Sequence, residues 1–211
     1  MACGGGADVV LFEGSGAANP PVRVDAVLLV VSAAQPKEYV LGYLGPYRLL
    51  LSDLVVVTMC EDFLVPSNEL RELVSGIEAI NPGVKVLKTV FRPRPLGGVE
   101  GRTVFIASTA PVKAVEVQCA HLEAAYGARV VGYSPNLADR RKLLKDLRGA
   151  SGAEVLATEL KAAGVDTVSM TAEKTGKELV YLENVPVALE GSLEEEIDGL
   201  YDIARRRHAG R

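Results

Sequence analysis

The strongest constraint on this chain is the alternation of short apolar, β-branched runs with longer amphipathic stretches along its length. Strands of a parallel sheet are buried on both faces and are therefore almost continuously apolar, whereas the helices that connect them are amphipathic. The pattern therefore predicts an α/β fold in which parallel strands are joined by crossover helices.

The predicted elements form two groups. The first contains strands over residues 7–12, 26–31, 54–58 and 84–89, and helices over residues 37–50 and 67–80. The second contains strands over residues 103–107, 129–133, 154–157 and 179–181, and helices over residues 112–126, 137–147 and 159–163, near Ala172, and over residues 192–208.

A segment rich in proline, glycine and arginine, Phe91–Gly98, separates the two groups. Such a composition marks turns and linkers, so we place a domain junction there. The 211 residues suffice for two small domains, since a core closes at roughly 100 to 150 residues per domain. We predict domains over residues 1–98 and 99–211.

Composition excludes several classes of protein. Cys3, Cys60 and Cys119 form no CxxC pair, which argues against a structural zinc site or a disulfide framework. The formal net charge is −4, and the one dense basic run, residues 205–207, sits where it complements a helix dipole or, alternatively, contacts a phosphate. Without a signal peptide or a membrane-length apolar stretch, we expect a soluble cytoplasmic protein with no nucleic-acid or membrane partner.

The most informative predicted strand carries Glu13 at its carboxyl end and runs directly into Gly14, Ser15 and Gly16. Ligands of open parallel sheets bind at the carboxyl ends of strands, where a carboxylate can reach magnesium. Glycines let backbone amides approach phosphate oxygens, and Ser15 can add a hydroxyl. The alternative is an ordinary glycine turn with Glu13 in solvent.

The predicted strand over residues 54–58 is followed by Met59, Cys60, Glu61 and Asp62. Glu61 or Asp62 is a candidate to recognise a nucleotide base, and Met59 can pack on its face. Cys60 is interpreted as a small buried residue of the same site. The alternative is an acidic loop that only begins the next crossover.

Arg92 and Arg94 are separated by one residue in the proline-rich segment. Two guanidinium groups held together suit a bisphosphate, because each can donate two parallel hydrogen bonds to anionic oxygens. Equally, the two side chains can pair with acidic residues across the junction.

Polar residues also follow the predicted strands of the second group. Thr109, Ser134 and Asn136 are predicted to share one edge of a sheet with Glu159 and Lys161. We take the first three as candidate substrate ligands and Lys161 as a candidate catalytic phosphate ligand, against the alternative of a solvated surface lysine. The two histidines have no neighbouring nucleophile that would indicate covalent catalysis.

The chain contains no GxxxxGK followed by Ser or Thr, the motif of a phosphate-binding loop. The nearest approach, Thr175-Gly176-Lys177, has Thr171 in place of the first glycine and Glu178 after the lysine. We interpret it as a turn or a helix end.

Four stretches, LFEGSGAANPPV, SDLVVVTMCE, TVFRPRPLGGVEGRTVFIASTAP and LATELKAAGVDT, resemble the cyclic 2,3-diphosphoglycerate synthetases in order and across most of the chain. The resemblance implies the C-terminal part of a P-loop NTPase-like parallel sheet followed by a second, Rossmann-like α/β domain. It also implies ATP and Mg²⁺ as cofactors, a catalytic and metal-binding role for Glu13, and ATP-driven closure of a phosphoanhydride within 2,3-diphosphoglycerate.

Members of that family have an additional N-terminal region with a phosphate loop before the segment that carries Glu13. We therefore expect a fragment, a split subunit or a truncated reading frame. The alternative function is a non-catalytic nucleotide- or phosphometabolite-binding subunit that needs a partner chain. An exposed edge or face of the first sheet predicts association with such a partner or with a second copy.

Overall fold

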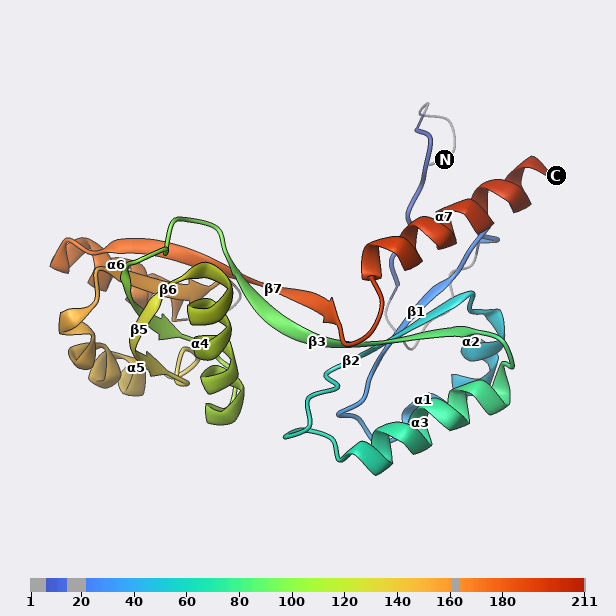
Figure 1. The fold of residues 1–211 in the computed structure, drawn as a ribbon, viewed down its shortest axis with the longest axis horizontal. Helices are drawn as coiled ribbons and strands as arrows, with labels where there is room; N and C mark the ends of the chain where they lie inside the picture. Colours follow the sequence, from blue (N-terminus) through green and yellow to red (C-terminus); the bar gives the residue numbers. More distant parts are fainter. Residues whose placement is uncertain (1–6, 15–21, 161–163, 211) are drawn as a thin grey trace. The chain divides into compact units, whose positions relative to one another are not determined.

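The computed structural model describes residues 7–14, 22–160 and 164–210, and the chain divides into two compact units (Figure 1). The first unit is Met1–Val90 together with Val187–Arg211, and the second is Phe91–Pro186. The change of unit therefore occurs before the predicted junction at Gly98, and the terminal helix returns to the first unit. A unit defined by packing need not be continuous in sequence, because a late strand can carry the chain back.

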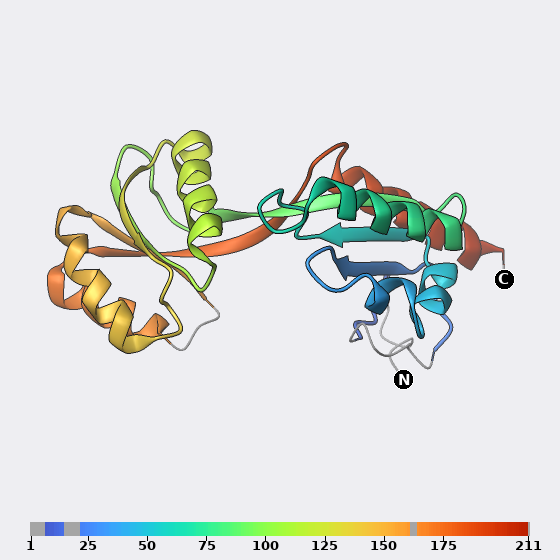
Figure 2. The same cartoon turned by 90° about the horizontal axis from the view of Figure 1, so that it is seen from below.

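The sheet of the first unit has three parallel strands in the order β1-β2-β3. The elements of this unit are β1 (Leu28–Ser32), α1 (Glu38–Leu41), α2 (Gly45–Leu51), β2 (Leu54–Thr58), α3 (Ser67–Ile80), β3 (Lys85–Pro95) and α7 (Leu193–Ala209). β3 extends into the second unit. Figure 2 shows β1 at the edge of the sheet, with α1 and α2 beside it.

Helices cover both faces of this sheet. On one face, α1, α2 and α3 enclose the larger core, which includes Val40, Leu49 and Ile77. On the other face, Leu193 and Leu200 of α7 pack against a smaller cluster of buried residues from β2 and β3. The first unit is therefore a three-layer α/β/α arrangement, as the apolar strand pattern predicts.

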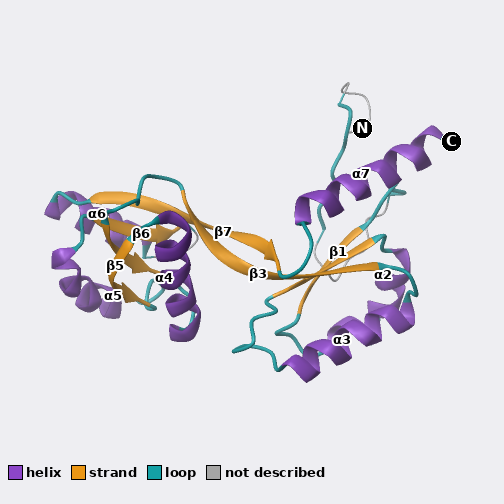
Figure 3. Cartoon of the chain, viewed as in Figure 1, coloured by secondary structure: helices purple, strands orange, loops and turns teal. Residues whose placement is uncertain are grey.

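The second unit repeats the three-layer plan around parallel strands in the order β7-β6-β4-β5 (Figure 3). One face packs against α4, and the other packs against α5, α6 and a 3₁₀ helix, η1. Its elements are β4 (Thr103–Ala107), α4 (Val112–Tyr126), β5 (Arg129–Ser134), α5 (Arg140–Asp146), η1 (Leu147–Gly152), β6 (Val155–Glu159), α6 (Val165–Thr175) and β7 (Glu178–Ala188).

β3 and β7 are each 11 residues long and carry the chain between the units. In the first unit the Leu189 amide donates to the Lys88 carbonyl at 2.9 Å, and in the second the Leu96 amide donates to the Tyr181 carbonyl at 2.8 Å. The sequence predicted only residues 84–89 and 179–181 as strand. Prolines argue against a strand when only the neighbouring residues are considered. The pairing that extends β3 and β7 joins residues far apart in the chain, so a short stretch of sequence does not reveal it.

The predicted strand over residues 7–12 is wrong. Residues 7–14 adopt no regular structure, and their apolar side chains are exposed, up to 91% for Leu11. A strand gains its hydrogen bonds and most of its burial from a neighbour, and this segment has none among the described residues. Glu13 and Gly14 are therefore not delivered to the end of a sheet strand, and Ser15 and Gly16 lie outside the described residues.

Other predicted boundaries also shift. The helix expected over residues 37–50 is divided into α1 and α2, because the chain turns between them so tightly that a Cβ on Gly45 would come within 2.0 Å of the Val40 carbonyl oxygen. The helix expected over residues 137–147 begins at Arg140, where the Asp139 carboxylate accepts two helix amides. The helix expected from Glu159 is wrong at its start, since Glu159 is the last residue of β6.

The basic C-terminal end of α7 forms an ion pair with Asp53, the residue before β2. Arg207 donates to both carboxylate oxygens of Asp53, at 2.9 and 2.7 Å, and Asp53 also accepts the Val27 amide at 3.0 Å. Arg207 is thus an ion-pair residue, although both it and the neighbouring Arg206 are exposed. Within the described part of the chain, no helix has the length and apolarity needed to cross a membrane.

Removing this ion pair should destabilise the first unit. The Asp53 side chain is only 12% exposed, so Arg207→Ala removes two hydrogen bonds from a nearly buried carboxylate. We expect a loss of roughly 1 kcal/mol in the free energy of unfolding. Urea denaturation measures it, with Arg206→Ala as the matched control. Equal effects of the two substitutions would contradict the role assigned to Arg207.

Candidate functional site

The carboxyl ends of β1 and β2 form a polar rim in the first unit. Met59, directly after β2, has a φ of 59° and is 40% exposed, an uncommon backbone conformation for a bulky residue. The Ser32 hydroxyl at the end of β1 donates to its sulfur at 3.4 Å. Met59 is thus held at the rim with part of its side chain in solvent.

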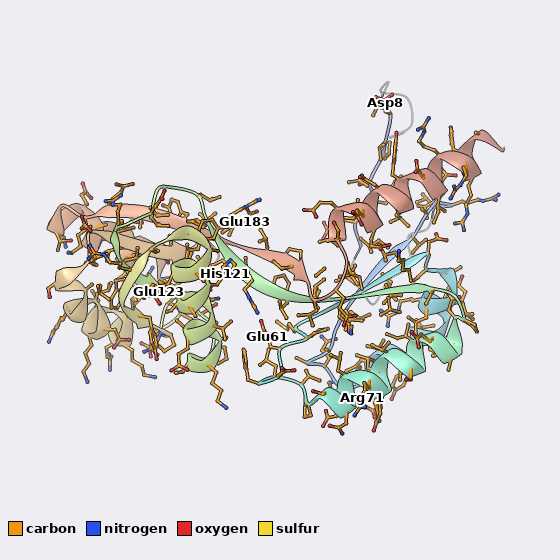
Figure 4. All side chains as sticks on the ribbon, in the orientation of Figure 1. Asp8, Glu61, Arg71, His121, Glu123 and Glu183 are labelled. Carbon is orange, nitrogen blue, oxygen red and sulfur yellow. The ribbon has the colours of Figure 1, made fainter. Side chains whose placement is uncertain are left out.

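Cys60 and Glu61 follow Met59 but face different surroundings. Cys60 is buried, its thiol donates to the Val57 carbonyl at 3.3 Å, and burial raises the pKa of the thiol. Glu61 is half-buried and lies in the loop after β2 (Figure 4). The structure therefore leaves Met59 and Glu61 accessible at the rim, while the Cys60 side chain belongs to the core.

The rim of the second unit is built around a buried carboxylate. Glu159, at the end of β6, is 8% exposed and accepts hydrogen bonds from the hydroxyls of Ser108 and Thr109 after β4. The Thr109 bond is 2.8 Å long. A buried carboxylate of this kind requires such donors, because an unpaired buried charge is costly. The carboxyl ends of β4 and β6 are therefore joined through Glu159.

A second carboxylate organises the neighbouring loop. Asp146, at the end of α5, accepts from the Ser134 hydroxyl at 2.7 Å and from the Asn136 side-chain amide at 2.8 Å. The two loops are linked by the Leu137 amide, which donates to the Ser108 carbonyl at 3.1 Å. The predicted residues Thr109, Ser134 and Asn136 thus share one rim, and each already donates to a carboxylate.

Sequence reasoning missed Ser108 and Asp146. Ser108 could have been found from its position beside Thr109 at the end of a predicted strand. Asp146 lies inside a predicted helix, and nothing in the sequence marks it as a site residue. Lys161, the candidate catalytic lysine, lies outside the described residues.

The two arginines of the proline-rich segment have different partners in this structure. Arg94 donates to Glu183 of β7 at 2.6 Å, which is the ion-pair alternative, within one unit (Figure 4). Arg92 donates to the Phe91 carbonyl at 2.8 Å and lies near His121, whose pKa is lowered by burial and then by the Arg92 charge.

No three His, Cys, Asp or Glu side chains within the described ranges converge on a position that could hold a metal ion. Glu13 is exposed, and within the part of the chain that the structure describes it belongs to no such group of three or more side chains.

The Glu159 network predicts a measurable stability effect. Glu159→Ala leaves the fully buried Ser108 hydroxyl without its acceptor, so we expect a loss of about 2 kcal/mol in the free energy of unfolding. Urea denaturation provides the measurement, and Glu173→Ala on the exposed side of α6 is the control. A loss no larger than the control's would show that the network contributes nothing to stability.

Two family models match consecutive parts of the chain. Residues 1–90 match "Cyclic 2,3-diphosphoglycerate synthetase, P-loop domain", and residues 95–185 match the "Cyclic 2,3-diphosphoglycerate synthetase C-terminal domain". The two matched regions follow the two units, apart from the returning C-terminal segment.

Curated relatives carry the same name, cyclic 2,3-diphosphoglycerate synthetase. The chain is 44% identical to the Rubrobacter xylanophilus protein over 212 residues, which is 100% of this chain and 47% of the relative. It is 43% identical to the Methanothermobacter thermautotrophicus protein over 201 residues, covering 95% of this chain and 43% of the relative. For the Thermococcus gammatolerans protein the identity is 46% over 184 residues, covering 87% and 41% respectively.

The chain thus spans less than half the length of these relatives. Because two models of one family together span most of its residues, and relatives of the same name align along nearly all of it, the chain belongs to the cyclic 2,3-diphosphoglycerate synthetase family.

Proposed function

We propose that this chain contributes the nucleotide-side and substrate-side units of an enzyme that forms cyclic 2,3-diphosphoglycerate from 2,3-diphosphoglycerate and ATP. The observation that carries the proposal is the consecutive match to the P-loop and C-terminal domains of one synthetase family. The polar rim at the carboxyl ends of parallel strands in each unit supports it, because that is where ligands of such sheets bind.

The proposed reaction is a phosphoryl transfer followed by ring closure. ATP gives its γ-phosphoryl group to one phosphate of the substrate and leaves as ADP. An oxygen of the other substrate phosphate then attacks the activated phosphorus, and inorganic phosphate departs as the new phosphoanhydride bond forms. Catalysis of such steps rests on positioning and on neutralising negative charge.

On the nucleotide side, we assign the base to the rim of β2. The partly exposed Met59 can pack on the ring and Glu61 can accept from an amino group, with buried Cys60 supporting the turn between them. Gly14, Ser15 and Gly16 remain our proposal for the phosphates. Glu13 offers the oxygen ligand that Mg²⁺ prefers, but among the described residues it belongs to no group of three or more candidate metal ligands, so we derive no step through the ion.

On the substrate side, we assign 2,3-diphosphoglycerate to the rim of the second unit. Thr109, Ser134 and Asn136 are prearranged there by Glu159 and Asp146. A phosphate bound at this rim would have to draw those donors away from the carboxylates, so its charge needs cations as well. Arg92, Arg94 and Lys161 are our proposal for them, with Arg94 exchanging Glu183 for phosphate.

Calorimetric titration of the chain with ATP and Mg²⁺ tests the nucleotide half of the proposal. If Glu13 contributes to the site, Glu13→Ala should weaken Mg²⁺-dependent ATP binding at least tenfold, about 1.4 kcal/mol. Asp8→Ala is the matched control, since Asp8 is an exposed acid of the same segment. Equal affinity of both variants and the wild type would remove Glu13 from the site.

A parallel titration with 2,3-diphosphoglycerate tests the second unit. Binding should weaken at least tenfold, about 1.4 kcal/mol, in Asn136→Ala. Binding of both ligands without product formation would favour the non-catalytic binding subunit. Absence of binding for both ligands, alone and with the remaining part of a relative supplied, would overturn the proposed function.

A further inference from the structure

A dense group of basic side chains lies on α5 and η1 in the second unit. Five of the nine residues over 140–148 are basic, and all five are exposed: Arg140, Arg141, Lys142, Lys145 and Arg148. The chain as a whole has a formal net charge of −4. Positive charge is therefore concentrated on this surface against the overall balance of the chain.

Helix stability does not account for these charges. Arg140, Arg141 and Lys142 occupy the first turn of α5, which contains no acidic residue. The N-terminal end of a helix is the positive pole of its dipole, so basic side chains there are unfavourable. α3, α6 and α7 show the favourable arrangement, with acidic residues in their first turns.

Three of the five bases also lack an acidic partner. Arg140 pairs with Asp166 and Lys142 pairs with Asp139, whereas no carboxylate in the described part of the chain forms an ion pair with the others. Spacings of four and three residues place those others on one side of the helical stretch. This group, which we call the basic face, consists of Arg141, Lys145 and Arg148.

Both ends of α5 contact residues at the rim of the second unit. At the C-terminal end, Asp146 accepts from Ser134 at 2.7 Å and from Asn136 at 2.8 Å. At the N-terminal end, Arg140 donates at 2.6 Å to a carboxylate in the first turn of α6, the helix that follows β6. A hollow of about 770 Å³, lined by residues 138–142, opens to solvent at the start of α5. The basic face therefore lies beside the loop that carries two of the assigned substrate ligands.

The rim itself repels an anion. Glu159 is buried, Asp146 is half-buried, and both carboxylates accept from the donors assigned to the substrate. The substrate carries two phosphates and a carboxylate, so it approaches this rim against charges of its own sign. Nearby cations offset that repulsion, and their field extends over about 10 Å at an ionic strength of about 0.1 M.

We propose that the basic face attracts 2,3-diphosphoglycerate and guides it to the rim of the second unit. This inference rests on the proposed function, which assigns the substrate to that rim, and it adds residues that act on the substrate at long range. The basic residues are confined to one short helix and the turn after it, which suits a small polyanion. A nucleic acid is recognised by a wider basic surface on a basic domain.

Calorimetric titration of the whole chain with 2,3-diphosphoglycerate at two salt concentrations tests the proposal. The double variant Arg141→Gln/Lys145→Gln should weaken binding about tenfold at about 20 mM salt, because two charges of the attracting field are removed. At about 0.5 M salt the same variant should differ from the wild type by less than about twofold, because the field is then screened.

The matched control is the double variant Arg129→Gln/Lys174→Gln. It also removes one arginine and one lysine from exposed positions of the second unit. Arg129 begins β5 and Lys174 lies in the last turn of α6, so both are at the ends of their elements that are remote from the rim. The control should bind the substrate within about twofold of the wild type at both salt concentrations, because these charges are separated from the rim by more than a Debye length at high salt and by the length of an element at low salt.

Three results would overturn the proposal. The first is equal weakening by the two double variants at low salt. The second is a loss in Arg141→Gln/Lys145→Gln that is the same at both salt concentrations, since long-range attraction is screened whereas a direct contact or a structural defect is not. The third is tighter binding of a short DNA duplex than of the substrate, lost in the same variant, which would assign the basic face to nucleic acid.

Titration with inorganic pyrophosphate, a second small polyanion, separates this inference from the proposed function. Binding of 2,3-diphosphoglycerate that neither depends on salt nor changes in the variant would uphold the function and contradict the role of the basic face. Salt-dependent binding of pyrophosphate that the variant weakens, without binding of 2,3-diphosphoglycerate, would uphold the attraction of small polyanions and contradict the function. Absence of binding for both polyanions would contradict both.

Discussion

Parallel pairing of strands is the constraint on which both units depend. A parallel strand buries both of its faces, and its carboxyl end aligns with those of its neighbours. In the first unit, β2 satisfies these demands, with a helix layer on each face. The alignment of carboxyl ends then brings residues that are remote in sequence, such as Ser32 and Met59, to one rim.

Elements with complete local signals could be predicted from the sequence. β2, β4 and α4 have the predicted limits, because a continuous apolar run or a helix-length amphipathic stretch bounded by turn residues fixes each locally. The lengths of β3 and β7 could not be predicted, since they depend on pairing between residues far apart in the chain. The strand predicted over residues 7–12 is wrong because pairing is again decisive. The composition of this segment favours a strand, but no described residue pairs with it.

The candidate sites also have features that the sequence predicts and features that it does not. Placing Thr109, Ser134 and Asn136 at one rim required only the order of strands and loops. Their hydrogen bonds to Glu159 and Asp146 depend on the geometry of three strand ends and a helix end, and no spacing in the sequence encodes that geometry. For Arg94 the sequence left both a ligand role and an ion-pair role open, and only the structure could reveal that its ion-pair partner is Glu183, because the two residues are far apart in the chain.

The open edge of β1 and the unpaired residues 7–12 are two expressions of one physical fact. Both are apolar and β-branched, yet β1 is a strand because β2 lies beside it, whereas no described residue pairs with the earlier segment. Propensity therefore marks which residues can join the sheet, and pairing decides which do.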